Sequence, residues 1–259
     1  MSRPYLLPTH LPLLARHHLA SFDALWHYKG DWFEAPNTER GGWSGVNYIE
    51  LADDNGNVHG FYLKRQESHC RRTWLRPIQG EPTFIREFKI LQHLNLRHVR
   101  KIKTPTLVFF ASQKDKAILL TGALTGYVSA DEWLKAYAVT NPNDKRALIA
   151  AAAKAVRNLH QAGVLHRSLY TKHLFVKNTP HLVDKDFEVA VIDFEKSRIS
   201  AGMAWFGLSD LITLNYRTPE LSRTNKLYFF KQYFGLTRIN AWYKALCCYV
   251  DYVSNKKSL

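Results

Sequence analysis

Cysteine is scarce in this sequence, and long apolar runs are missing from it. Among 259 residues there are three cysteines: Cys247 and Cys248 are neighbours, and Cys70 lies far from them. Such an odd, sparse set argues against a disulfide framework and for a reducing compartment. Nowhere do about 18 apolar residues run together, so we expect no transmembrane helix. Prolines and histidines break up the first 20 residues, which therefore lack the continuous apolar run of a signal peptide.

Acidic residues are also few compared with basic ones. The chain has 36 Lys and Arg against 22 Asp and Glu, a formal net charge of +14. An excess of this size favours a polyanionic partner: a nucleotide, a nucleic acid, an anionic lipid or a phosphorylated glycolipid. Charge alone does not choose between them, and a solvated basic surface is the alternative. With 46% apolar residues and no low-complexity tract, the chain can form one large domain or two small lobes.

Apolar periodicity predicts a strand-rich region over residues 1–124, with one clear helix. The turn sequence DDNGN (53–57) lies between two strand-like segments and predicts a hairpin. Pro82 begins a segment with helical spacing, where proline is well tolerated in the first turn. The expected strands are 45–52, 60–66, 106–113 and 116–124, and the expected helix is 82–96.

Residues 125–259 are predicted to be mostly helical. A capped start and Gly163 just past its end mark a long helix over 143–163. The aromatic-rich tail 227–253 is also predicted to be helical. We expect its aromatics to pack inside the helical region, with a membrane-interface helix as the alternative. The other expected elements are a helix over 130–138 and strands over 173–178 and 188–194.

Several residue types of the first region suit phosphate binding. A glycine-rich turn precedes the first strong strand, and glycine lets backbone amides approach phosphate oxygens closely. Lys64 ends an apolar strand, and Glu87 follows on the helix at a distance that allows an ion pair. Taken singly, each has a structural explanation: a plain turn, an exposed lysine or a solvated glutamate. The residues of the glycine-rich turn are Gly41, Gly42, Ser44 and Gly45.

The second region adds HRSLYTKH (166–173), a stretch that follows the long helix. An apolar strand then ends in Asp193, where a carboxylate can bind the magnesium ion that bridges nucleotide phosphates. The order glycine turn, lysine, glutamate, loop and aspartate is the order that a kinase requires. No Cys/His clusters have zinc-site spacing, and no Gly-x-Ser-x-Gly elbow is present.

Five segments together resemble the lipopolysaccharide kinase (Kdo/WaaP) family, and especially its InaA-like branch. The resemblance implies an α+β, protein-kinase-like bilobal fold, with a β-rich N-lobe in residues 1–124 and a mainly helical C-lobe in residues 125–259. It also implies ATP and Mg as cofactors, with transfer of the γ-phosphoryl group to a sugar hydroxyl of the lipopolysaccharide inner core. The segments are RGGWSGV (40–46), YLKRQ (62–66), GEPTFIREFKILQHL (80–94), HRSLYTKHLFV (166–176) and VIDFEKSR (191–198).

Roles carry over by position as implications of this resemblance. The glycine-rich turn would cover the phosphates, and Lys64 would hold them with Glu87 as its partner. Asp193 would bind magnesium. His173 falls where other kinases carry an asparagine metal ligand, so it would either bind the metal or hold the loop through hydrogen bonds. Asp210 resembles the helix aspartate that supports the catalytic-loop backbone.

The chain departs from the family pattern at Ser168, the position of the usual catalytic aspartate. A serine hydroxyl cannot accept the substrate proton as a carboxylate does, and loss of a general base typically costs on the order of 10²–10⁴ in rate. Three interpretations follow. The chain is an unusual kinase in which Glu195 or a phosphate oxygen takes the proton; it is a pseudokinase that binds nucleotide and acts as a sensor or scaffold at the envelope; or it has a basic surface for nucleic acid.

The nucleic-acid interpretation lacks a recognisable module, so we expect no nucleic acid as partner. The expected partners are an inner-core sugar of lipopolysaccharide or another envelope glycolipid, together with peripheral contact to an anionic membrane. The expected location is cytoplasmic, with peripheral contact at the inner face of the inner membrane.

Overall fold

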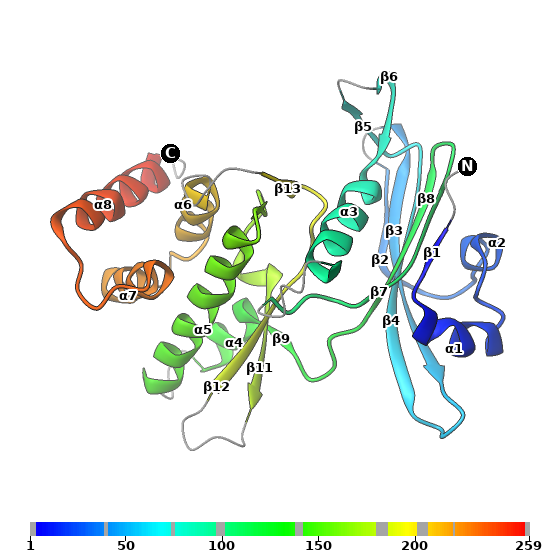
Figure 1. The fold of residues 1–259 in the computed structure, drawn as a ribbon, viewed down its shortest axis with the longest axis horizontal. Helices are drawn as coiled ribbons and strands as arrows, with labels where there is room; N and C mark the ends of the chain where they lie inside the picture. The colour runs from blue at the N-terminus through cyan, green and yellow to red at the C-terminus, as the bar shows by residue number, and fades with distance from the viewer. Residues whose placement is uncertain are drawn as a thin grey trace. The chain divides into compact units, whose positions relative to one another are not determined.

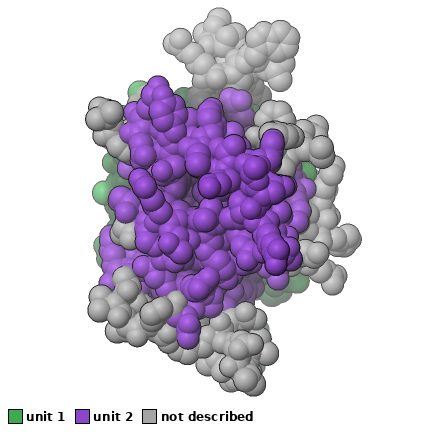
Figure 2. Space-filling view, turned by 90° about the vertical axis from the view of Figure 1, so that its left-hand side faces the viewer, with its two compact units in different colours: residues 1–93, 105–125 green, residues 94–104, 126–259 purple. Residues whose placement is uncertain are grey.

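The structure is a computed structural model of the chain (Figure 1). The chain forms two compact units, coloured separately in Figure 2. Unit 1 comprises residues 1–93 and 105–125, and unit 2 comprises residues 94–104 and 126–259. The sequence analysis expected the N-lobe to end at residue 124 and to include residues 94–104. In the structure these eleven residues belong to unit 2. The structure describes residues 4–38, 41–73, 76–96, 102–137, 142–179, 186–200, 207–219 and 221–256.

Unit 1 is built on a six-stranded antiparallel sheet in the order β1-β7-β8-β4-β3-β2. Figure 1 shows α1 and α2 on one face of this sheet and α3 on the other. The strands of the sheet are β1 (Tyr5–Leu6), β2 (Trp32–Asn37), β3 (Trp43–Ala52), β4 (Val58–Glu67), β7 (Leu107–Gln113) and β8 (Lys116–Gly122). The remaining elements are η1 (Pro8–His10), α1 (Leu11–Arg16), α2 (Phe22–Trp26), α3 (Thr83–Leu96) and the hairpin of β5 (Cys70–Thr73) with β6 (Arg76–Pro82).

The β3–β4 hairpin forms where the turn sequence predicted it. The Asp53 carboxylate accepts hydrogen bonds from the backbone N–H groups of Asn55 and Asn57, each at 2.9 Å, which is the side-chain chemistry of a tight turn. Along β3 buried and exposed residues alternate, so one face of the strand packs into the core. Ile49 from β3 and Phe61 from β4 belong to that core, next to Leu14 and Leu25 of the two short helices.

A buried arginine ties the chain before β3 to the sheet. The Arg65 guanidinium donates to the backbone carbonyls of Trp26 and Tyr28 at 2.6 and 3.0 Å, and to Asn47 Oδ1 at 2.7 Å. Its guanidinium carbon lies 4.7 Å from the centre of the Trp32 ring, a cation–π distance. Although burial lowers the pKa of Arg65, arginine stays charged at neutral pH. The network therefore fixes residues 26–32 against β3 and β4.

Unit 2 contains five helices in its described residues, with short strands between them. The long helix α5 buries a small-residue face rich in alanine, and Gly163 takes a positive φ of 75° just after its end, as the sequence predicted. The helices are α4 (Ala130–Tyr137), α5 (Pro142–Gln161), α6 (Leu208–Tyr216), α7 (Arg223–Phe234) and α8 (Ala241–Lys256). The strands and the 3-10 turn are β9 (Val128–Ser129), β10 (Val164–Leu165), η3 (Thr171–His173), β11 (Leu174–Thr179), β12 (Asp186–Val191) and β13 (Arg198–Ile199).

The aromatic tail is two helices rather than the one helix predicted over 227–253. Gly235 ends α7 in the left-handed conformation with φ 66°, and its N–H donates to the carbonyl of Gln232. The Leu236 N–H donates to the Lys231 carbonyl at 2.9 Å, so the two bonds close a Schellman-type cap. Apolar periodicity did not reveal this break because aromatic residues continue on both sides of the glycine.

The tail aromatics also divide between core and surface. Phe230 and Tyr233 of α7 are buried, as the packing interpretation expected. On α8, Trp242, Tyr249 and Tyr252 are exposed, against that interpretation. None of the helices in the described ranges combines the length and the apolar character that a membrane span requires.

Replacing Arg65 by Met should destabilise the protein. The substitution leaves two buried carbonyls and the Asn47 amide oxygen without a donor, which we expect to cost about 3 kcal/mol. The melting temperature should fall by roughly 5–10 °C. The control is Arg223→Met, because Arg223 is exposed at the start of α7. Equal melting temperatures for the two variants would contradict the role given to the network.

Candidate active site

The lysine and glutamate predicted to pair do so within unit 1. Lys64 Nζ on β4 lies 2.8 and 3.0 Å from the two carboxylate oxygens of Glu87 on α3. The Glu87 side chain is 4% exposed and the Lys64 side chain 20% exposed, so the ammonium keeps some access to a ligand while the carboxylate is enclosed. Phe84, one helical turn before Glu87, places its ring centre 6.0 Å from Lys64 Nζ.

The glycine-rich stretch lies where β2 joins β3. Gly41 and Gly42 precede β3, and Ser44 and Gly45 belong to it. A Cβ on Gly42 would lie 2.2 Å from the Glu67 carbonyl oxygen, and a Cβ on Gly45 would lie 2.7 Å from the Trp32 ring. Close packing therefore accounts for these two glycines, whereas Gly41 has a positive φ of 76° and open space around it.

In unit 2, the Asp210 carboxylate holds the backbone of the HRS segment. Its Oδ2 accepts from the His166 N–H at 2.6 Å, and its Oδ1 accepts from the Arg167 N–H at 2.7 Å. Asp210 has no solvent exposure. Arg167 has a φ of 64°, which is unfavourable for an arginine, and the bond to Asp210 holds it there.

A second buried chain of hydrogen bonds reaches Asp210 from α5 and α7. His160 Nε2 lies 3.2 Å from Asp210 Oδ2, and His160 Nδ1 lies 2.7 Å from the Tyr233 hydroxyl. Burial, followed by the effect of the Asp210 carboxylate, raises the pKa of Tyr233 to about 12, so the phenol keeps its proton. Tyr233 then donates to Nδ1, and His160 donates from Nε2 to the carboxylate.

His166 links the HRS segment to the residue before Asp193. Its Nε2 lies 2.8 Å from the Ile192 carbonyl, and its Nδ1 accepts from the Ser168 N–H at 3.3 Å. These partners assign the proton of the neutral ring to Nε2. Burial lowers the pKa of His166, in agreement with a neutral ring. The His166 imidazole therefore joins the HRS segment to the end of the strand that precedes Asp193.

His173 and Asp193 form the part of the site that can hold a cation. His173 Nδ1 lies 2.7 Å from the Ser168 carbonyl, which can only accept, so Nδ1 carries a proton. Burial lowers the pKa of His173 against the opposing effect of Asp193. The neutral ring then presents the Nε2 lone pair 3.2 Å from Asp193 Oδ2, which is also an acceptor.

Two facing acceptors at this distance suit a shared cation. Neighbouring ligands of an octahedral Mg²⁺ site, with bonds of about 2.1 Å, lie about 3.0 Å apart. Within the described ranges no group of three or more His, Cys, Asp or Glu side chains is arranged so that it could hold a metal ion by itself. A metal at His173 and Asp193 would therefore need further oxygens from phosphate and water, as magnesium does in nucleotide sites. Asp193 has a φ of 63°, an unfavourable conformation of the kind that functional sites retain.

Ser168 lies at the centre of this arrangement and is 4% exposed. Its N–H bonds to His166 and its carbonyl bonds to His173, so both hydrogen bonds use its backbone. The backbone of residue 168 is thus positioned by the side chains of His166 and His173.

Comparison with known proteins identifies the family of this chain. The sequence profile of the lipopolysaccharide kinase (Kdo/WaaP) family matches residues 23–233, which is most of the chain. The chain belongs to this family. Among its relatives, protein InaA of Escherichia coli (strain K12) is 31% identical over 183 residues, 68% of this chain and 78% of InaA.

A sequence relative and a solved structure that match the chain are both named WaaP. The lipopolysaccharide core heptose(I) kinase WaaP of Escherichia coli (strain K12) is 34% identical over 128 residues, which are 46% of this chain and 47% of that enzyme. A solved structure described as WaaP in complex with acyl carrier protein has a TM-score of 0.69 and 21% identity, and the match covers 98% of this chain and 99% of that one. The predicted fold class is confirmed: an α+β, protein-kinase-like fold with a β-rich first unit and a mainly helical second unit.

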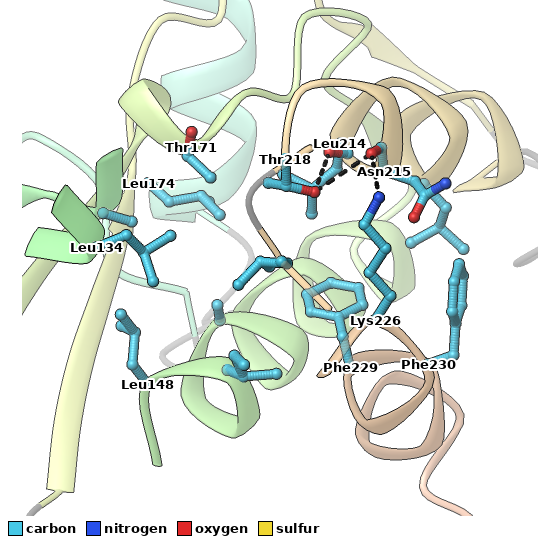
Figure 3. A pocket seen from close by; sticks show the side chains of 15 residues that line it. Leu134, Leu148, Thr171, Leu174, Leu214, Asn215, Thr218, Lys226, Phe229 and Phe230 are labelled. Carbon is cyan, nitrogen blue, oxygen red and sulfur yellow. Dashed lines mark hydrogen bonds between the residues drawn. The ribbon is translucent and has the colours of Figure 1, made fainter. Parts of the chain in front are cut away.

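This member of the Kdo/WaaP family also has an apolar pocket inside unit 2 (Figure 3). Side chains of α4, α5, α6 and α7 line it. Lys226 reaches across its edge to the Asn215 carbonyl at 3.1 Å. Thr171 and Leu174, from the segment that follows Ser168, form part of the wall. The lining suits an apolar group rather than a phosphate.

The sequence predicted most residues of the two clusters but not the two side chains, His160 and Tyr233, that hold Asp210 through hydrogen bonds. Lys64 with Glu87, and Ser168 with His173, Asp193 and Asp210, were all named from the sequence. His160 and Tyr233 were not, because their partners lie 50 and 73 positions away and no local pattern marks such a pairing.

Substituting Gly207 should disturb the Tyr233–His160–Asp210 chain. A Cβ at Gly207 would lie 2.4 Å from His160 Nδ1 and 2.7 Å from the Tyr233 hydroxyl, although the helical φ of −65° would itself permit alanine. Overpacking of this kind costs about 1–3 kcal/mol, so Gly207→Ala should lower the melting temperature by roughly 3–9 °C.

Gly122→Ala is the matched control, because a Cβ there would meet its nearest neighbour, Thr106, at an ordinary 3.5 Å. Its melting temperature should stay close to that of the wild type. If both alanine variants melt together with the wild type, the contact at Gly207 has no structural importance.

Proposed function

We propose that this chain is an ATP-dependent kinase that transfers the γ-phosphoryl group to a sugar hydroxyl of the lipopolysaccharide inner core. The observation that carries the proposal is the enclosed ion pair of Lys64 and Glu87. Apolar residues in place of a buried ion pair are often equally stabilising, so stability alone explains such a pair poorly. A nucleotide site explains it, because Lys64 still has an accessible side.

Each residue then has a separate task in binding ATP. The Lys64 ammonium would hold the α- and β-phosphates, and Glu87 would keep it in position by accepting two hydrogen bonds. The turn before β3, with Gly41, would cover the phosphates through backbone N–H groups. Gly42, Ser44 and Gly45 would shape that turn, since the packing of Gly42 and Gly45 fixes its path.

The second cluster would act at the γ-phosphate. Asp193 and His173 would hold Mg²⁺, which neutralises charge on the β- and γ-phosphates when bound. Asp210 keeps the backbone of residues 166–168 fixed, so the acceptor hydroxyl would be positioned against a rigid loop.

Ser168 limits the rate in this scheme. Its hydroxyl is not a base near neutral pH, so the acceptor proton would pass to Glu195 or to a phosphate oxygen. Phosphoryl transfer goes through a loose transition state, in which positioning and charge stabilisation supply most of the catalysis. The alternative proposal is a pseudokinase that binds nucleotide at the same residues and acts as a sensor or scaffold at the envelope.

The acceptor in this proposal is an inner-core sugar or another envelope glycolipid. Support comes from the family and from its WaaP relatives, which are named core heptose(I) kinases. A net charge of +14 suits an acceptor that carries phosphate or carboxylate groups. An acceptor embedded in lipid would bring the enzyme to the inner face of the inner membrane as a peripheral protein.

Nucleotide binding should depend on both clusters. Mg-ATP at about 100 times its Kd adds about 2.7 kcal/mol of stability, which should raise the melting temperature of the wild type by several degrees. Lys64→Met and Asp193→Asn should each lose most of this increase, measured by thermal shift against the same variant without ATP. That reference matters because Lys64→Met also leaves the Glu87 carboxylate without its partner.

Lys89→Met is the control for the lysine, because Lys89 lies on α3 with a 60% exposed side chain paired to Glu81. It should keep the full increase. A wild type that Mg-ATP does not stabilise would refute both the kinase and the pseudokinase proposals.

Restoring a carboxylate at residue 168 should separate those two proposals. Ser168→Asp supplies a general base, so transfer from ATP to purified lipopolysaccharide core should rise on the order of 10²–10⁴. Ser168→Asn is the matched control, since it has nearly the same size without the basicity. If the Asp and Asn variants have the same rate, the loop does not position an acceptor, and the pseudokinase proposal is favoured.

A further inference from the structure

The helix α8 has an unusual outer face. Its inner side carries Val250 and Ser254, and the Ser254 hydroxyl donates to the Ile212 carbonyl of α6 at 3.1 Å. The opposite side carries Trp242, Tyr249 and Tyr252, which are 51%, 51% and 58% exposed. Spacings of seven and three residues place the three rings in one stripe along the helix.

A helix on the surface of a protein normally turns polar residues to water. Here three large aromatic side chains stand outward, and the smaller exposed residues Ala245 and Cys248 lie among them. Tryptophan and tyrosine have an apolar ring with a polar end, the combination that is enriched at the boundary between lipid and water. The stripe therefore has the chemistry of a membrane-interface helix rather than of a solvated surface.

The segment that carries the stripe is rich in positive charge. The described segment 221–256 contains six lysines and arginines and a single carboxylate, Asp251. Asn215 of α6 donates to that carboxylate at 3.5 Å, which places Asp251 on the inner side of α8. Lys256 lies 4.8 Å from the Tyr252 ring centre, and Lys244 is exposed. The basic residues are Arg223, Lys226, Lys231, Arg238, Lys244 and Lys256.

We propose that the outer face of α8 is a docking surface for an anionic lipid bilayer. Trp242, Tyr249 and Tyr252 enter the headgroup region, while Lys244 and Lys256 meet the lipid phosphates. Figure 2 looks toward the end of unit 2 where Figure 1 places α7 and α8. The proposal deepens the proposed function, since a lipid-embedded acceptor requires such contact, but binding to lipid involves neither nucleotide nor acceptor.

Sedimentation with vesicles tests this surface. The probe is a vesicle of phosphatidylcholine with about 30% phosphatidylglycerol, at low salt and without ATP, and the reference is a vesicle of phosphatidylcholine alone. Wild type should sediment with the anionic vesicles and be released by salt. The triple variant Trp242→Ser/Tyr249→Ser/Tyr252→Ser should bind about tenfold more weakly or worse. Lys244→Glu/Lys256→Glu should lose the salt-sensitive part of the binding.

The matched control is Phe33→Ser/Tyr48→Ser, which removes aromatics that are 60% and 40% exposed on β2 and β3 of unit 1. It should bind vesicles as the wild type does, and so should Lys64→Met. The proposal is overturned if the triple variant binds as the wild type does, or if the wild type ignores anionic vesicles. It is also overturned if sedimentation velocity shows a dimer that the triple variant loses, because the stripe would then contact a second copy.

The two proposals fail separately. Loss of vesicle binding with intact nucleotide stabilisation removes only the docking surface. Loss of nucleotide stabilisation with intact vesicle binding removes only the kinase site. All surface variants should remain folded and melt within a few degrees of the wild type, because the substituted aromatics are 40–60% exposed and the two lysines are exposed.

Discussion

The backbone at residues 166 and 167 depends on one carboxylate in unit 2 that has no access to water. Asp210 accepts from two consecutive backbone N–H groups and from the imidazole of His160. A buried carboxylate is stable only when its lone pairs are satisfied, so each donor must stay in place. The Tyr233 hydroxyl holds the His160 ring through Nδ1. Side chains of three helices, α5, α6 and α7, therefore act together on the backbone of the HRS segment.

The same bonds support the least favourable backbone positions in the site. Arg167 and Asp193 both have a positive φ, which costs on the order of 1–3 kcal/mol for such residues. Asp210 holds Arg167 directly through its N–H. Asp193 follows Ile192, whose carbonyl accepts a hydrogen bond from His166. Both positions are thus held by buried groups, Asp210 and His166, so internal contacts alone support the unfavourable backbone of this segment.

Local patterns predicted the elements that carry this site and one contact between them, the pair of Lys64 and Glu87. The turn chemistry of DDNGN and the helical spacing after Pro82 predicted the β3–β4 hairpin and α3, and therefore the pairing of Lys64 with Glu87. The break at Gly235 was missed, because aromatic residues on both sides hide a capping glycine. Exposure of the α8 aromatics was missed as well, since periodicity shows which residues share a face but not which face is covered. The buried chain from Tyr233 to Asp210 is tertiary and leaves no local signal.

At residue 168 the backbone and the side chain have separate parts in the structure of the HRS segment. The bonds that shape the segment end on the backbone of this residue and on the side chains of His166, His173 and Asp210. Its own side chain takes no part in these bonds. These hydrogen bonds of the segment therefore use only the backbone of residue 168. A substitution at residue 168 can therefore change the chemistry of the side chain there while these hydrogen bonds of the segment stay in place.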